Sequence, residues 1–163
     1  MRVSVIKFKR MKLSIEELLN ELSVTEKFIL LLLYAGKEGV KGPLWLQKEI
    51  FELAKSIREL AEELDFSAYS YGPWSEALTE ARDMLENSGL IVSQEDGRLV
   101  LTEEGKKMAQ ILWHKTDEKI ISLLKETREF LESLDWDELL LYIYSTSPTM
   151  ADKSVKYLSL IHI

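Results

Sequence analysis

The stretch that decides the fold is PWSEALTEARDMLENSGLIVSQEDGRLVLTEEG, residues 73–105. Pro73 is placed to open a helix that stops before Gly89, because proline suits the first turn of a helix and glycine its end. Two short apolar runs follow, residues 90–92 and 98–101, and Glu-Asp-Gly lies in the turn between them. A hairpin this short is barely stable alone in water, so it must pack on helices as a wing does.

Helical periodicity precedes this stretch along the chain. We predict a short helix over residues 14–22, with Ser14 as its N-cap and Glu17 completing a capping box. The next helix, residues 24–34, is apolar nearly all round and is therefore expected to be the buried centre of the domain. A third helix is predicted over residues 43–64, because its apolar side chains recur at helical spacing.

The remaining segments complete a mainly helical chain. Residues 67–71 are predicted to form an aromatic loop, and Thr102 is expected to cap a helix after the hairpin. Further helices are predicted over residues 117–134 and 136–144. The fold class is therefore mainly α with a small β-hairpin: a winged helix-turn-helix with additional C-terminal helices. We divide the chain into a basic N-terminal arm (1–12), a winged-helix core (13–113), a C-terminal helical extension (114–157) and a tail (158–163).

Composition restricts the class of protein. Of the 163 residues, 46% are hydrophobic and 30% are charged, so the chain can bury a core and is neither disordered nor built for a membrane. The longest apolar run, residues 28–34, is far too short to span a bilayer. Cysteine is absent, which excludes disulfides and thiol chemistry, and the N-terminus lacks a signal-peptide core. We expect a cytoplasmic protein that does not contact membranes.

The sequence lacks the patterns of a catalytic or metal site. Its two histidines, His114 and His162, are far apart, whereas even a catalytic zinc site needs three protein ligands. Adjacent acids such as Glu103 and Glu104 do not share a helix face and are expected to be solvated. No glycine-rich phosphate loop is present. We therefore expect no enzymatic activity, no cofactor and no metal.

The net charge of −7 is unevenly distributed. Residues 1–12 carry five basic side chains and no acid, so the remaining residues sum to −12. Such an arm suits phosphates or an acidic partner, although its basic side chains could equally serve only solubility. The helix before the hairpin would be the recognition helix of a winged helix, and it is acidic. It carries Glu76, Glu80, Asp83 and Glu86 against Arg82, a composition that the phosphates of duplex DNA repel.

Aromatic residues cluster around the predicted loop. Phe66 and Trp74 are expected to close the core between the neighbouring helices. Tyr69 and Tyr71 alternate along the chain, so one face of the loop could present both hydroxyl groups. Such a pair suits a peptide-binding groove or a platform on which bases stack.

Several motifs resemble those of one protein family. Residues 42–48 (GPLWLQK) are similar to a Gly-x-x-x-Leu-Gln-Lys motif, and residues 69–75 (YSYGPWS) to a Tyr-x-Tyr-Gly-Pro-aromatic-Ser motif. Residues 101–106 (LTEEGK) resemble the helix entry that follows the wing in many winged-helix regulators. Residues 139–154 look like the family's C-terminal signature.

On these motifs, residues 24–157 resemble the YwgA-like proteins, which are common in archaea and related to the SocA-type antitoxin (Panacea) domain. The resemblance implies a winged-helix fold and a regulatory or antitoxin-like role, and it carries over no catalytic residues. Relatives usually have a basic residue just before Leu-Gln-Lys, where this chain has Leu44 and Trp45. That departure weakens the case for a phosphate contact at this turn.

Two functions follow from these features. In the first, a non-catalytic regulator of the antitoxin or adaptor kind binds a protein, such as a basic toxin or regulator, through Tyr69, Tyr71, Glu76, Glu80 and Asp83. In the alternative, a transcriptional regulator binds duplex DNA as a homodimer, with the contact residues Arg2, Lys7, Lys9, Arg10, Lys41 and Lys48. The acidic helix places the protein-interaction hypothesis first.

The last six residues, LSLIHI, can be encoded by a DNA string that resembles a sequencing adapter. The codons CTG-TCT-CTT-ATA-CAC-ATC would encode them, and that string resembles the mosaic-end adapter of transposase-based sequencing libraries. We hypothesise that residues 158–163 are read-through and that the natural chain continues differently after Tyr157. The competing interpretation is a genuine strand, which the apolar residues on both alternate faces would suit.

We expect the nucleotide sequence behind residues 158–163 to contain these codons. Reading the gene in an independent isolate checks this, because an adapter remnant would be absent there. Different codons, or the same six residues in an independently sequenced relative, would end the read-through hypothesis.

Overall fold

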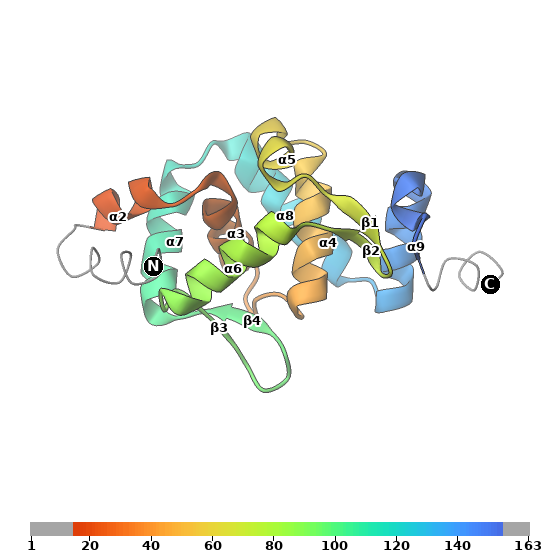
Figure 1. The fold of residues 1–163 in the computed structure, drawn as a ribbon. Coiled ribbons are helices and arrows are strands. Elements are labelled where there is room, and N and C mark those ends of the chain that lie inside the picture. The colour runs from red at the N-terminus through yellow and green to blue at the C-terminus, as the bar shows by residue number, and fades with distance from the viewer. Residues whose placement is uncertain (1–14, 155–163) are drawn as a thin grey trace.

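Helix α3 (Val24–Ala35) is the centre of the computed structural model, which describes residues 15–154. Ser23 caps α3 in a capping box with Glu26, and Ile29, Leu30 and Leu32 have no exposed surface. The predicted central helix is therefore confirmed. Around it pack α5 (Arg58–Leu64), α6 (Glu76–Asn87) and α7 (Glu103–Lys115), as Figure 1 shows.

The predicted hairpin after the helix before Gly89 is present. Strands β3 (Ile91–Ser93) and β4 (Leu99–Leu101) pair antiparallel, and Thr102 caps α7 by accepting a hydrogen bond from the Gly105 N–H at 3.1 Å. Val40 pairs with Leu99 through two main-chain hydrogen bonds of 2.9 and 3.0 Å, which adds a third strand position beside the hairpin. The fold class, mainly α with a small β-hairpin, is confirmed.

The single helix predicted over residues 43–64 is wrong, because the structure divides it. Helix α4 (Pro43–Ala54) ends before Ile57, whose backbone is extended at φ −125° and ψ 98°. Helix α5 then starts in a new direction and carries Leu60 and Leu64 into the core beside α3 and α6. Helix α2 (Ile15–Glu21) covers most of the predicted first helix, and its proposed cap Ser14 lies outside the described residues.

A second correction concerns the aromatic loop. Residues 67–74 form another antiparallel hairpin, β1 (Ser67–Tyr69) with β2 (Gly72–Trp74). Pro73 lies in β2 opposite Ala68 and does not open a helix. Instead α6 begins at Glu76, because the Ser75 side chain provides the N-cap that proline cannot.

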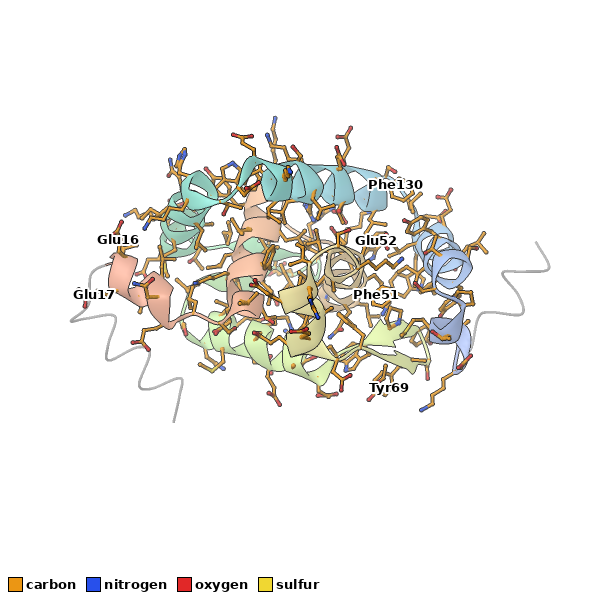
Figure 2. The ribbon with its side chains drawn as sticks, turned by 90° about the horizontal axis from the view of Figure 1, so that it is seen from above. Glu16, Glu17, Phe51, Glu52, Tyr69 and Phe130 are labelled. Atoms are coloured by element: carbon orange, nitrogen blue, oxygen red, sulfur yellow. The ribbon has the colours of Figure 1, made fainter. Side chains whose placement is uncertain are left out.

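The C-terminal helices build a second core. Helix α8 (Glu118–Glu132) places Leu124 in the main core and Leu131 in the second. It leads into α9 (Trp136–Thr146) and the 3₁₀ turn η1 (Pro148–Ala151). Figure 2 shows α8 along one side of the molecule and α6 along the other. The second core consists of Phe51, Leu131, Leu139, Leu140, Ile143 and Tyr144.

A buried ion pair connects α8 to α4. The Arg128 guanidinium lies 3.2 Å from a Glu49 carboxylate oxygen and also donates to the Gly39 carbonyl oxygen. Glu49 has no exposed surface, and this desolvation raises its pKa despite the opposing effect of Arg128. Arg128 keeps a second contact, with Glu132 at 3.8 Å, whereas removing the Arg128 side chain would leave the buried Glu49 carboxyl without its cationic partner.

Leu31 tests the central position of α3. It is 4% exposed, so Leu31→Ala should leave a cavity and lower the free energy of unfolding by about 2–5 kcal/mol, measured by urea denaturation. Leu141→Ala is the matched control, since Leu141 is 38% exposed and should lose far less. A Leu31→Ala loss below about 0.5 kcal/mol, typical of surface positions, would contradict the buried position.

Candidate functional site

The two family-like motifs meet in a buried contact between α4 and the start of α6. The Gln47 side-chain amide donates to the Ser75 carbonyl oxygen at 3.0 Å and to the Thr79 hydroxyl at 3.2 Å. In return the Ser75 N–H donates to the Gln47 side-chain oxygen at 2.8 Å. Gln47 and Ser75 are both buried, so these hydrogen bonds are shielded from water and costly to break.

Ser75 connects further elements through its hydroxyl. That group donates to the Leu64 carbonyl oxygen at the end of α5 and accepts from the Leu78 N–H at 3.3 Å in α6. One serine thus joins the end of α5, the start of α6 and, through Gln47, the middle of α4.

Lys48 holds the hairpin beside this contact. Its ammonium group donates to the Pro73 carbonyl oxygen at 3.0 Å, and the side chain is 1% exposed. Burial lowers the pKa of Lys48 to about 7, since desolvation disfavours the charged form. Gly72 leaves room for this side chain. A Cβ there would lie 3.3 Å from Lys48 Cε, and its φ of +90° also favours glycine.

The β1–β2 hairpin, α4 and α6 border an open pocket of about 310 Å³. Three apolar or aromatic side chains at its rim are exposed: Leu44 (39%), Tyr69 (44%) and Tyr71 (43%). The Trp74 indole N–H donates to a Glu76 carboxylate oxygen at 3.0 Å. We call this the hairpin pocket; its lining is Leu44, Lys48, Tyr69, Ser70, Tyr71, Gly72, Trp74 and Glu76.

Three of the five residues predicted to bind a partner therefore share one pocket: Tyr69, Tyr71 and Glu76. Figure 2 shows Tyr69 on the side of the molecule along which α6 runs. Trp74 was expected in the core, yet it is only half-buried and stacks edge-on with Tyr69 at 6.3 Å between ring centroids. Phe66 does pack inward, edge-on against Phe51 at 5.2 Å.

The other two predicted partner residues continue along α6. Glu80 and Asp83 follow Glu76 at helical spacing, and all three are exposed. Glu80 and Asp83 line an adjacent groove of about 490 Å³ with Glu26 and Glu63, and no basic residue lines it. We call the surface formed by Glu76, Glu80 and Asp83 the acidic face of α6.

The two described lysines predicted to contact phosphates donate instead to main-chain carbonyl oxygens of this chain. The expected phosphate contact of Lys48 is corrected. Its side chain is buried, and its ammonium group donates to the Pro73 carbonyl oxygen. The Lys41 ammonium donates to the carbonyl oxygens of Glu132 and Leu134 at 3.1 and 3.3 Å, and lies 4.1 Å from the Trp45 ring centroid. The remaining candidates, Arg2, Lys7, Lys9 and Arg10, lie outside the described residues.

Sequence reasoning did not identify Gln47, Lys48 and Leu44 as parts of this site. The two motifs contained these residues, but their spacing does not show that they converge. Within residues 15–154, no cluster of three metal-ligating side chains occurs, and none of the helices could cross a bilayer. No family model, curated protein or solved structure matches this chain.

Lys48 should make stability depend on pH. Above pH 7 the folded state holds Lys48 neutral, whereas the unfolded chain keeps it charged up to its ordinary pKa of 10.5. The unfolded state therefore binds more protons in this window, and stability rises with pH, by up to about 1.4 kcal/mol per unit. Urea denaturation between pH 7 and pH 9.5 measures this rise.

Lys48→Met isolates the effect, because the other titrating groups are shared with the wild type. The difference in unfolding free energy between the two proteins should change with pH in favour of the wild type as pH rises. Parallel curves would show that Lys48 stays charged in the folded protein.

Proposed function

We propose that this chain is a non-catalytic winged-helix regulatory protein of the YwgA-like kind, which binds a protein partner in the cytoplasm as an antitoxin or adaptor does. One observation carries the proposal: the acidic face of α6 is exposed and adjoins the hairpin pocket. The described elements leave this side of the molecule uncovered, as Figure 2 shows for α6. An accessible surface with both charge and aromatic side chains suits a protein interface.

The charges on α6 argue for a basic partner. A helix that reads the major groove needs basic or amide side chains toward the bases, and α6 has Arg82 as its basic residue. Arg82 pairs with Asp83 at 3.2 Å and with Glu86 at 2.8 Å, so its charge is compensated on its own helix. Duplex phosphates would meet carboxylates here, whereas a basic protein surface would meet complementary charge.

The hairpin pocket supplies the apolar part of the same surface. Tyr69, Tyr71 and Leu44 each expose more than a third of their area, and tyrosine is frequent among residues that dominate binding energy. A partner that combines basic side chains with an apolar anchor would complement both the acidic face of α6 and the hairpin pocket. An amphipathic helix with lysine or arginine on its polar side has this composition.

Charge reversal tests the acidic face. Glu76→Lys, Glu80→Lys and Asp83→Lys together should abolish recovery of the partner in a pull-down, with the product of the neighbouring gene as bait, because like charges then oppose each other. The matched control reverses three exposed acids elsewhere, Glu95, Glu126 and Glu129, and should keep recovery intact. Circular dichroism of both variants confirms that they fold.

Unchanged recovery with the first variant would refute this interface. The DNA alternative predicts a different result: a duplex shift at low salt that disappears when Arg2, Lys7, Lys9 and Arg10 become glutamine. A shift with that pattern, together with unchanged partner recovery, would make the chain a DNA-binding regulator.

A further inference from the structure

Lys48 is a buried amino group without a described counter-ion, and its Nζ lies 5.9 Å from the Trp136 ring centroid. Its ammonium has three N–H donors, and the Pro73 carbonyl oxygen accepts one of them. Within residues 15–154, desolvation alone perturbs its pKa, and no ion pair compensates it. The buried Arg128, by contrast, has the Glu49 carboxylate 3.2 Å away. An uncompensated charge is expensive in a protein interior and is found preferentially at functional sites.

Lys48 lies at the wall of an open surface pocket. Lys48 lines the hairpin pocket together with the aromatic side chains of Tyr69, Tyr71 and Trp74. Its volume of about 310 Å³ falls at the lower end of the range for small-molecule sites, about 300–1,000 Å³. Mostly apolar walls and a single buried donor group are the usual design of such a site.

We propose that the hairpin pocket binds an organic monoanion, a carboxylate on an aromatic or apolar body, with Lys48 as the counter-ion. The carboxylate accepts the ammonium donors that Pro73 leaves, and the body packs against Tyr69, Tyr71 and Trp74. This site is separate from the acidic face that the proposed function uses, and it stands whether or not that function holds.

Glu76 sets the charge that the pocket accepts. Its carboxylate lies at the pocket lining, held by the Trp74 indole N–H at 3.0 Å. A second negative charge on the ligand would approach this carboxylate and be repelled. Dianions such as phosphate esters should therefore bind more weakly than monocarboxylates.

Binding should take up a proton. At pH 8 Lys48 is largely neutral, because burial lowers its pKa to about 7, and an adjacent carboxylate favours the charged form. The other titratable groups around it are Glu76 on α6, Tyr69 and Tyr71 in the hairpin, and Tyr144 on α9 near Gly72. Burial raises the pKa of Tyr144, so Tyr144 stays protonated and does not supply the uptake.

Calorimetry with a matched ligand pair tests the proposal on the full chain. At pH 8, 2-naphthoate should bind with net proton uptake, seen as a heat that varies with the ionisation enthalpy of the buffer. The neutral 2-naphthamide should bind about tenfold to a hundredfold more weakly, the equivalent of one charge-assisted hydrogen bond. Equal binding of the two ligands, or naphthoate binding without proton uptake, would overturn the proposal.

Three variants locate the site. Lys48→Met should lose the preference for naphthoate over naphthamide. Lys55→Met, at the C-cap of the same helix, should keep it, because the Lys55 ammonium pairs with Glu52 at 2.9 Å. Tyr71→Ala changes an exposed wall residue, so it should fold normally and weaken both ligands. Naphthoate affinity that neither Lys48→Met nor Tyr71→Ala alters would place binding elsewhere and refute the site.

Peptides distinguish the two sources of such an anion. A short peptide ending in phenylalanine with a free carboxylate should compete with naphthoate if the natural ligand is a protein C-terminus, and its amidated form should not. Competition by neither peptide, with naphthoate still bound, would assign the pocket to a free small acid. Failure of naphthoate and both peptides to bind at millimolar concentration would exclude the site, whatever the outcome of the pull-down.

Discussion

The hydrogen bonds between the Gln47 side chain and the Ser75 main chain are the constraint on which the hairpin pocket and the start of α6 depend. They join α4 to the residue that caps α6 and that also binds the end of α5. Beside them, the contact from Lys48 to the Pro73 carbonyl oxygen fixes the hairpin against α4. Buried polar groups of this kind are satisfied in only one arrangement of their elements, so they specify where α6 starts and where the pocket forms.

The orientation of α6 then decides the chemistry of the outer surface. Leu78, Ala81 and Leu85 face the core, which requires the acids at the intervening helical positions to face solvent. The result is a helix before the β3–β4 hairpin that presents carboxylates to solvent. Under the proposed function this face meets a basic protein surface, because function depends on the groups at the site and not on the fold alone.

Three buried or half-buried basic residues differ in the groups that their cationic ends contact. Arg128 is paired with Glu49 and holds α8 to α4. Lys41 satisfies the carbonyl oxygens where α8 ends, over the Trp45 ring. Lys48 is the most deeply buried of the three and lines the hairpin pocket; its ammonium contacts are the Pro73 carbonyl oxygen and, at 5.9 Å, the Trp136 ring. A buried amino group at the edge of a pocket, without a described carboxylate beside it, motivates the ligand proposal.

Local patterns in the sequence determined the buried helix α3, the β3–β4 hairpin, the cap at Thr102 and the helical spacing of Glu76, Glu80 and Asp83. Each depends on residues within a few positions of one another, where periodicity and capping act. Only the tertiary structure decided the break after Ala54, the β1–β2 hairpin and the inward position of Lys48. No glycine or proline marks that break, and its cause is the packing of Leu60 and Leu64 on α3 and α6. Buried Lys48 donates a hydrogen bond to a carbonyl oxygen 25 residues away, and contacts between segments so far apart leave no periodic signal along the chain.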